Sequence, residues 1–487
     1  MNKSKHPQWA LKHKRKGTEL RLINGKYYLY EVTSKWDPQK KRARKITGKL
    51  LGRITEQGFI ESKKRKAERE VAIKSVSVKE YGATQFLSTE MSDVIENLKR
   101  VFPEEYKHIA AYSFLNILYK SPLKNVEFYF ENSFLSNKYN DISLSPKKLT
   151  KLLKDIGSNR EKITKFLKLN ILNKKAETIL VDATQFFSYS RSLELNKIGY
   201  NNKLEFEPQV NTLFIYSPEL RQPLYYRIVA GDIREVKAFE LTMKESGIID
   251  AIIITDKGFY SKKNIKIINE SNLKYIIPLR RNSKLIDYSR IEIPKKKGFE
   301  GYFKHDDRFI WYYSYELESG DKVYVYYDEK LKGKEESDYL ERVEKEAEEY
   351  NMSNFHKIYN RFGTLAILTK NMDMEAEEVY RRYKSRNEIE VMIDSMKNIL
   401  KADSSYMRSK ESFEGWMFLN FISLIFYYRI NNLLIEKKLL SKYSVMDVLM
   451  YLKEIRKVKI NDNWYTAEIS SKTEKMMKKL NIELDIT

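Results

Sequence analysis

Hydrophobic and polar positions follow two different periods in the first third of the 487-residue chain. Residues 19–54 alternate in steps of two around the tight-turn pair Asn24-Gly25, which predicts a small β-meander. Residues 79–170 carry apolar clusters at helical spacing and predict an all-α domain, either a DNA-binding module or a packing element. A charged helix or linker at 61–75 connects the two stretches.

The pattern changes at residue 177 to short apolar runs separated by helical stretches. The predicted strands and helices are, in order, strands at 178–181, 208–217 and 222–232, a helix at 233–246, a strand at 251–255, a helix at 259–270 and a strand at 273–280. Buried strands and flanking helices in this order indicate an α/β fold with a ribonuclease-H-like catalytic core. The first strand ends in Asp182 and the fourth in Asp256.

A β-rich insertion is predicted after these strands. Residues 291–330 are dense in alternating aromatic residues, 334–360 predict a charged helix, and 361–371 predict one more strand. Residues 374–400 contain neither glycine nor proline and predict one continuous helix. Beyond it we expect a basic loop, a long buried helix and a helical remainder.

We therefore expect six segments. They are a basic, DNA-binding β-meander at 1–75, an α-helical domain at 76–172, the first part of the catalytic core at 173–285, the β-rich insertion at 286–372, the second part of the core at 373–440 and a C-terminal helical region at 441–487. The insertion therefore interrupts the catalytic core in the sequence.

The net charge is strongly positive, because 90 Lys and Arg residues against 67 Asp and Glu residues give +23. This excess predicts a polyanionic partner, and double-stranded DNA is the leading candidate. The basic residues of the meander loop are Lys40, Lys41, Arg42, Arg44 and Lys45. They are about equally consistent with phosphate contacts and with a solvated cationic face. No membrane partner is expected, because the most apolar run, 416–428, is shorter than the roughly 18 residues that span a bilayer.

Cysteine is absent, which excludes disulfides, thiolate zinc sites and cysteine nucleophiles. The five histidines include no pair at metal-ligand spacing, so any metal must be held by oxygen, which favours Mg²⁺ or Mn²⁺. The N-terminal stretch is basic but lacks the apolar segment of a secretory signal, so we expect a cytoplasmic protein.

Acidic residues in two places are the candidates for catalysis. A single strand-end aspartate is usually a turn former or a helix cap, but Asp182 and Asp256 fall in one predicted sheet, at the edge where open α/β folds bind ligands. At about 100° per residue, one face of the 374–400 helix presents Tyr383, Arg386, Glu390, Asp394 and Lys397. A solvated charged face is the ordinary interpretation of such a stripe, and an ion pair with Lys397 is the favoured role of Asp394.

Residues 383–397 contain the pattern Y-x2-R-x3-E-x6-K, while VDAT (181–184) and TDKGFYS (255–261) contain the strand-end aspartates. Together these stretches resemble the signature and the two aspartate motifs of DDE transposases of the "insertion sequence four" group. The resemblance covers roughly residues 177–440, including the β-rich insertion between the second and third acids.

The resemblance implies that Asp182, Asp256 and Glu390 hold Mg²⁺, with Mn²⁺ able to substitute. Three converging carboxylates can hold two such ions about 4 Å apart for an in-line phosphoryl displacement. It also implies that Tyr383 and Arg386 contact phosphates near the cleaved end and that Lys397 holds a phosphate or the terminal base. Members of the group capture a flipped base with an aromatic residue, for which the candidates here are Trp311, Tyr312, Phe355 and Tyr359, although an apolar strand role suits each of them better.

These expectations describe a DNA transposase that binds the terminal inverted repeats of its element, cleaves the ends and joins the 3′-OH ends to target DNA. Because both ends must be processed together, a homodimer on paired ends is expected. Two alternatives stay open: a ribonuclease-H-like nuclease or resolvase that cuts without joining, and a catalytically idle DNA-binding protein derived from a transposase.

Overall fold

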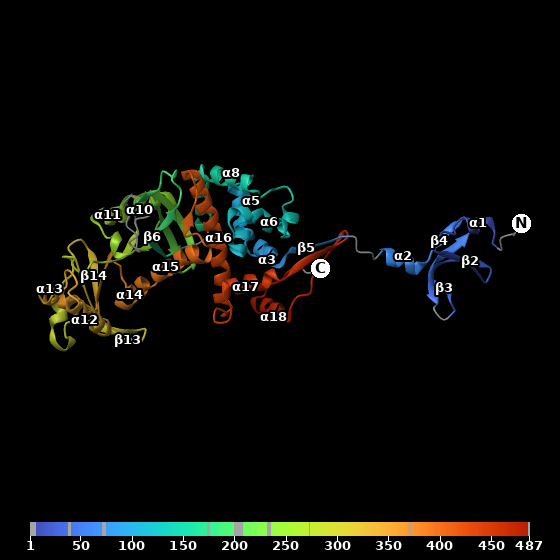
Figure 1. Cartoon of the computed structure of the whole chain (residues 1–487). Coiled ribbons are helices and arrows are strands. Elements are labelled where there is room, and N and C mark those ends of the chain that lie inside the picture. The colour runs from blue at the N-terminus through green and yellow to red at the C-terminus, as the bar shows by residue number, and fades with distance from the viewer. Residues whose placement is uncertain are drawn as a thin grey trace. The chain divides into compact units, whose positions relative to one another are not determined.

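A computed structural model describes residues 6–37, 40–70, 75–172, 176–198, 208–230, 235–271, 273–370 and 372–485 (Figure 1). The chain packs into two compact units, Met1–Val78 with Val458–Tyr465 and Lys79–Lys457 with Thr466–Thr487. Each unit has a hydrophobic core of its own. The predicted helical segment, core strands and insertion all lie in the larger unit, because one continuous cluster of buried apolar side chains joins them.

The N-terminal unit is a four-stranded antiparallel meander, as the alternation predicts. Its elements are α1 (Gln8–Leu11), β1 (Thr18–Ile23), β2 (Lys26–Asp37), β3 (Arg42–Thr55), β4 (Gly58–Glu61) and α2 (Lys63–Glu70), with strand order β1-β2-β3-β4. Asn24 and Gly25 both have positive φ, which fits a two-residue hairpin turn. Two residues that lead into the predicted basic loop, Pro38 and Gln39, lie outside the described residues.

The first part of the larger unit is helical, which confirms the predicted pattern. Its helices are α3 (Gly82–Glu90), α4 (Ser92–Val101), α5 (Tyr106–Tyr119), α6 (Val126–Glu131), α7 (Leu135–Lys138), α8 (Pro146–Gly157) and α9 (Arg160–Leu172), with a 3₁₀ turn η1 (Leu123–Asn125) before α6. Helices α5 and α8 pack against α16 (Lys410–Glu436), the predicted long buried helix.

Helix α16 is long and apolar enough to cross a membrane by length and composition alone, but 67% of its most apolar window is buried inside this fold. Its contact with α8 depends on two glycines. A Cβ on Gly157 would lie 1.8 Å from the carbonyl oxygen of Glu411, and one on Gly415 would lie 2.0 Å from that of Leu153. No larger residue fits at either position without moving the two helices apart.

The core strands occur in the predicted order in one central sheet. Strands β6 (Thr178–Ser188), β8 (Pro208–Ser217) and β9 (Gln222–Ala230) pair antiparallel, with β7 (Lys197–Ile198) added to β8, while β10 (Ile252–Ile254) and β11 (Lys274–Pro278) continue parallel to β6 on its other side. Helix α10 (Glu235–Ser246) leads to β10, and α11 (Lys262–Glu270) connects β10 to β11. Residues 231–234, at a predicted strand–helix boundary, lie outside the described residues.

The strands of the predicted insertion extend this sheet instead of forming a separate one. They are β12 (Gly301–His305), β13 (Arg308–Glu316), β14 (Asp321–Asp328) and β15 (Thr364–Lys370), in the antiparallel order β12-β13-β14-β15-β11. The predicted helix at 334–360 is two helices, α12 (Glu329–Glu344) and α13 (Met352–Ile358), because the chain turns between them where Glu346 and Glu349 have positive φ. Short 3₁₀ turns are η3 (Ser289–Glu292), η4 (Pro294–Lys296) and η5 (Tyr359–Arg361).

The C-terminal region contains a β-hairpin, so the expectation of a wholly helical remainder is wrong. Its elements are α17 (Val445–Lys453), β17 (Arg456–Ile460), β18 (Asn463–Thr466) and α18 (Ser471–Leu480), and β17 also pairs with β5 (Val76–Glu80). Alternating Val458 and Ile460 before a positive-φ turn at Asn461 account for the hairpin.

Candidate active site

Asp182 and Asp256 occupy equivalent positions on neighbouring strands. Parallel strands β6 and β10 place Leu180 opposite Ile254, and each aspartate comes two residues after its member of that pair. The two aspartates therefore lie just past the same end of the β6–β10 pairing, on strands that are about 4.8 Å apart. Asp182 lies within β6 and not at its end as predicted, since β8 continues to pair with β6 as far as Phe187.

Glu390 comes from a helical stretch that is less regular than predicted. The expected single helix consists of α14 (Ala376–Lys384), α15 (Asn387–Asp394) and a π-helical turn η6 (Ser395–Ile399). Between α14 and α15 the backbone hydrogen bonds span three residues instead of four. The N–H of Arg386 donates to the carbonyl of Tyr383 at 3.0 Å. The Ser385 hydroxyl donates to the Arg382 carbonyl at 2.7 Å, a local bond that competes with regular helix geometry.

Arg386 connects Glu390 to the two aspartates. Its Nη2 lies 2.5 Å from Glu390 Oε1, and its charge also acts on Asp182 and Asp256. The same guanidinium acts to lower the pKa of the Tyr383 hydroxyl, against the larger effect of burial. Arg386 is 20% exposed and Glu390 46% exposed, so the cluster opens to solvent on the side of Glu390. Five of the predicted site residues are therefore brought together.

Negative charge is in excess at this cluster. Burial, with Glu390 and Asp256 adding to its effect, raises the pKa of Asp182 to about 6, even though Arg386 and the Ala183 backbone N–H act to lower it. Burial also raises the pKa of the Tyr383 hydroxyl, which keeps it protonated. A bound cation would favour the ionised form of a carboxyl whose pKa is raised mainly by burial and further by neighbouring acids.

The residues fit a divalent cation by the chemistry of their donors. Three carboxylates offer the hard oxygen ligands that Mg²⁺ and Mn²⁺ prefer. Within the described part of the chain, no three acidic or histidine side chains stand at metal-ligand spacing. The ion pair between Glu390 and Arg386 is one reason why the three acids do not stand at this spacing, because Glu390 would have to leave that pair to bind a metal.

A comparison with family models identifies the protein family. Residues 173–426, more than half of the chain, match the transposase DDE domain. The chain belongs to the transposase DDE domain family. The matched range includes both aspartates, Glu390, Arg386 and Tyr383, so all three acids of the cluster lie inside the family's domain.

Two further comparisons add little to this assignment. A search of solved structures finds the piggyBac transposase, in a cryo-EM structure of its synaptic complex with hairpin DNA, at 10% identity and a TM-score of 0.41 over 76% of this chain and 78% of that one. A likeness with so low a TM-score and identity supports no conclusion about this chain. A search of curated proteins finds no match.

Lys397 of the transposase lies in the π-helical turn, which displaces it from the predicted helical stripe. Its Nζ lies 5.2 Å from the centre of the Phe186 ring on β6 and 3.9 Å from Asp403 Oδ1. Asp394 accepts a hydrogen bond from the Asn398 side chain at 2.5 Å. Phe186 lies two strand periods after Asp182, so alternation along β6 could have indicated that it is near the site. No sequence signal indicated that Asp403 lies near Lys397.

The aromatic candidates for base capture lie in the strands and helices after β11. Trp311 and Tyr312 are half-buried on β13, and Phe355 is buried in a small cluster with other aromatic residues. Tyr359 is 45% exposed and has Lys332 Nζ 4.0 Å from its ring centre. The contacts of the described residues place none of these four beside the three acids.

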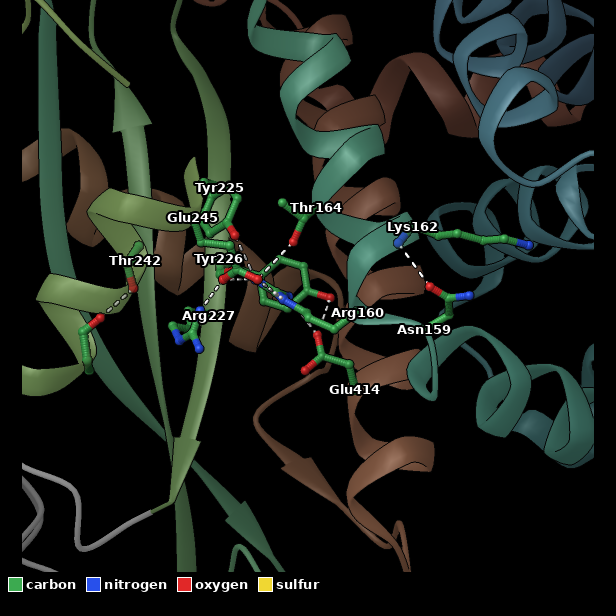
Figure 2. A network of polar contacts seen from close by, with 11 residues as sticks. Asn159, Arg160, Lys162, Thr164, Tyr225, Tyr226, Arg227, Thr242, Glu245 and Glu414 are labelled. Carbon is green, nitrogen blue, oxygen red and sulfur yellow. Dashed lines mark hydrogen bonds and ion pairs between the residues drawn. The ribbon is translucent and has the colours of Figure 1, made fainter. Parts of the chain in front are cut away.

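A second charged cluster of the transposase has no counterpart in the sequence analysis (Figure 2). Arg160 of α9 donates from Nη1 to Glu414 Oε1 of α16 at 2.8 Å and from Nε to Glu245 Oε1 of α10 at 3.2 Å. Tyr226 of β9 donates from its hydroxyl to Glu414 at 2.9 Å, and Arg227 pairs with Glu245. Although burial acts in the opposite direction, the two arginines hold the pKa of Glu245 below its usual range. This cluster joins the helical part of the unit to the central sheet.

Proposed function

We propose that this chain is a metal-dependent DNA transposase of the "insertion sequence four" group with a ribonuclease-H-like core. The observation that carries the proposal is the equivalent placement of Asp182 and Asp256 on paired strands, with Glu390 held beside them through Arg386. The strand order β9-β8-β6-β10-β11, three antiparallel strands followed by two parallel ones, supports the ribonuclease-H-like assignment.

Asp182, Asp256 and Glu390 are the proposed ligands of Mg²⁺, for which Mn²⁺ can substitute. When bound, such ions activate the attacking oxygen and stabilise the leaving one. The side chains around them position the DNA. Arg386 offers a planar fork of donors that suits a phosphate, and the protonated Tyr383 hydroxyl can donate to the same strand. Lys397, beside Phe186, supplies a further cation along β6.

The proposed partners are the terminal inverted repeats of an insertion sequence and a target duplex. The net charge of +23 supports a DNA partner, because phosphate contacts from lysine and arginine dominate affinity for duplex DNA. The reaction requires both ends to be cut and their 3′-OH groups joined to the target. We propose a homodimer on paired ends for this reason, acting in a bacterial-type cytoplasm on nucleoid DNA.

The decisive experiment measures Mg²⁺-dependent cleavage and joining on a duplex that carries the DNA flanking the gene. Glu390→Gln should reduce cleavage by about 10³-fold, the scale of a lost metal contribution, while DNA binding is retained. Glu377→Gln is the matched control, because it removes an exposed glutamate of α14 that also pairs with an arginine four residues away.

Each alternative predicts a different result. A nuclease or resolvase would cut the duplex without joining its 3′-OH ends to a second DNA. An idle DNA-binding descendant would bind without Mg²⁺-dependent cleavage in the wild type. Equal cleavage by wild type and Glu390→Gln would show that Glu390 is not part of the catalytic site.

A further inference from the structure

The distal half of the β2–β3 hairpin extends past the core of the N-terminal unit. The ladder there pairs residues 32–37 with residues 42–47, beyond the buried Leu29 and Leu51. Six pairs at about 3.3 Å per residue give a ribbon about 20 Å long. Figure 1 shows the hairpin reaching out from the rest of its unit. We call these paired residues the ribbon.

Most side chains of the ribbon are exposed on both of its faces. Trp36 is 62% exposed and Ile46 is 41% exposed, so neither packs into a core. A two-stranded hairpin without a core is marginally stable in water by itself. The ribbon therefore has the properties of a surface that is completed by a partner.

Residues opposed in a β-ladder project to the same face, so the register divides the ribbon into two faces. The cationic face carries Lys35, Arg42 and Arg44, together with Thr33, Asp37 and Ile46. The braced face carries Val32, Ser34, Trp36, Ala43, Lys45 and Thr47. On the braced face Lys45 Nζ lies 2.7 Å from Glu19 Oε1 of β1, and Thr47 accepts a hydrogen bond from Arg21.

The two faces differ in how their cations are neutralised. Lys45 has the Glu19 carboxylate, whose pKa is lowered chiefly by the hydrogen bond from Lys45. Lys35 stands directly opposite Arg44, and like charges in this position repel. The one acid of this face, Asp37, stands opposite Arg42 at the far end of the ladder. A polyanion on the cationic face would relieve the repulsion.

We propose that the ribbon inserts into the major groove of double-stranded DNA with its cationic face toward the base edges. This inference rests on the proposed function, which makes duplex DNA the partner. The major groove is about 12 Å wide and admits a two-stranded ribbon. Arginine in the groove recognises guanine through O6 and N7, and an apolar side chain contacts the thymine methyl group.

The spacing of side chains on β3 matches the spacing of bases. Arg42, Arg44 and Ile46 follow one another at every second residue, about 6.7 Å apart along the strand. Two steps of B-form DNA rise about 6.8 Å. The ribbon is therefore suited to read guanine, guanine and thymine at positions two base pairs apart, while Lys35 contacts the phosphates beside them.

The test selects bound sequences from a duplex pool with a randomised centre, using the full chain. Wild type should enrich a sequence with guanines two base pairs apart. Arg44→Ala should lose roughly tenfold of the preference for guanine at one of these positions, and Arg42→Ala the preference at the other, consistent with one bidentate base contact each. Methylation of guanine N7 at these positions should weaken binding by the wild type.

Lys45→Ala is the matched control, because it removes one cation from the same strand on the braced face. It should enrich the wild-type sequence and lose only a few-fold in binding to the unselected pool, the effect of one phosphate contact. Arg44→Gln repeats the test with a longer polar side chain if Arg44→Ala does not fold by circular dichroism. Unchanged base preferences in the Arg42 and Arg44 variants, or an equal loss in Lys45→Ala, would overturn the proposal.

The outcome is separable from that of the proposed function. Asp182→Asn should enrich the same sequence as the wild type without cleaving it. A wild type that enriches this sequence but does not cleave would overturn the transposase proposal alone. A wild type that cleaves, while Arg44→Ala keeps every base preference, would overturn the ribbon proposal alone.

Discussion

Two charged clusters of the larger unit contain the same kinds of side chain in a different balance. Around Arg160, two arginines face two glutamates. The hydroxyls of Tyr226 and Thr164 donate to the same carboxylate oxygens that Arg160 contacts, Glu414 Oε1 and Glu245 Oε1. Around Asp182, three acids share the single guanidinium of Arg386. The first cluster lowers the pKa of one of its acids, Glu245, whereas the second raises that of Asp182 to about 6.

The difference indicates what each cluster is for. A balanced and hydrogen-bonded cluster holds elements together, because each charge has a partner in the folded state. An unbalanced cluster costs stability and persists where a ligand uses the excess charge. Removing a charge should therefore have opposite effects on folding at the two places.

The largest expected effect on stability is at the balanced cluster. Arg160→Leu leaves Glu245 and Glu414 without their shared cation, and it should lower the free energy of unfolding by about 3–5 kcal/mol. Denaturant titration of the metal-free protein measures this. Lys266→Leu is the control, because its pair with Glu270 is exposed on both sides and should contribute less than about 1 kcal/mol. Equal effects of the two substitutions would show that the Arg160 cluster does not hold the helices to the sheet.

Asp182→Asn should instead stabilise the metal-free protein. An unfolded aspartate titrates near about 3.9, while the folded pKa of Asp182 is about 6. Between these values the folded state binds more protons, so wild-type stability is greatest below the window and falls as the pH rises through it. The asparagine variant lacks this fall. Its free energy of unfolding at about pH 8 should exceed that of the wild type by about 3 kcal/mol.

The measurement is denaturant titration across this pH range in the presence of a chelator. The two proteins should differ least at the acid end, where Asp182 is protonated. A wild type whose stability follows the same pH dependence as the variant would show that Asp182 has an ordinary pKa. The comparison between the two clusters would then lose its electrostatic basis.

The unbalanced cluster could be predicted from the sequence because its members leave local signals. Asp182 and Asp256 each follow an apolar run, and Glu390 is spaced from Arg386 by one helical turn. The balanced cluster leaves none, since Arg160 reaches partners 85 and 254 positions away. An isolated arginine or glutamate on an amphipathic helix is indistinguishable from a surface residue until the packing of that helix is known.

The fold was predictable where one period persists through an element. Alternation located the meander and the aromatic strands of the insertion, short apolar runs located the core strands of the central sheet, and helical spacing located the helices before β6. Periodicity failed where local hydrogen bonds override it, as at Ser385, which tightens the helix before Glu390, and at the π-helical turn that contains Lys397. It also did not show that the strands after β11 join the core sheet, because strand partners are set by packing across long separations.

Arg386→Gln sharpens the comparison by making the second cluster more unbalanced. Without the guanidinium, the pKa of Asp182 should rise further, by about one unit, because a neighbouring opposite charge lowers a carboxyl pKa by that order. The pH at which cleavage is half-maximal should rise by the same amount. Arg381→Gln is the control, since Arg381 pairs with exposed Glu377 on α14. An unshifted pH profile with a lower plateau would assign Arg386 to DNA contact alone.

The smallest effect is expected at Asp394, the acid that shares the helical stretch but not the cluster. Its side chain is exposed and accepts a hydrogen bond from Asn398, a role that asparagine can also fill. Asp394→Asn should therefore change Mg²⁺-dependent cleavage and the free energy of unfolding by less than about 0.5 kcal/mol, or roughly twofold in rate. Parallel cleavage assays with Glu390→Gln test this, because both variants remove one negative charge from the same helix. A loss comparable to that of Glu390→Gln would make Asp394 a fourth acid of the site, and the excess charge that separates the two clusters would then be larger than the contacts of Arg386 indicate.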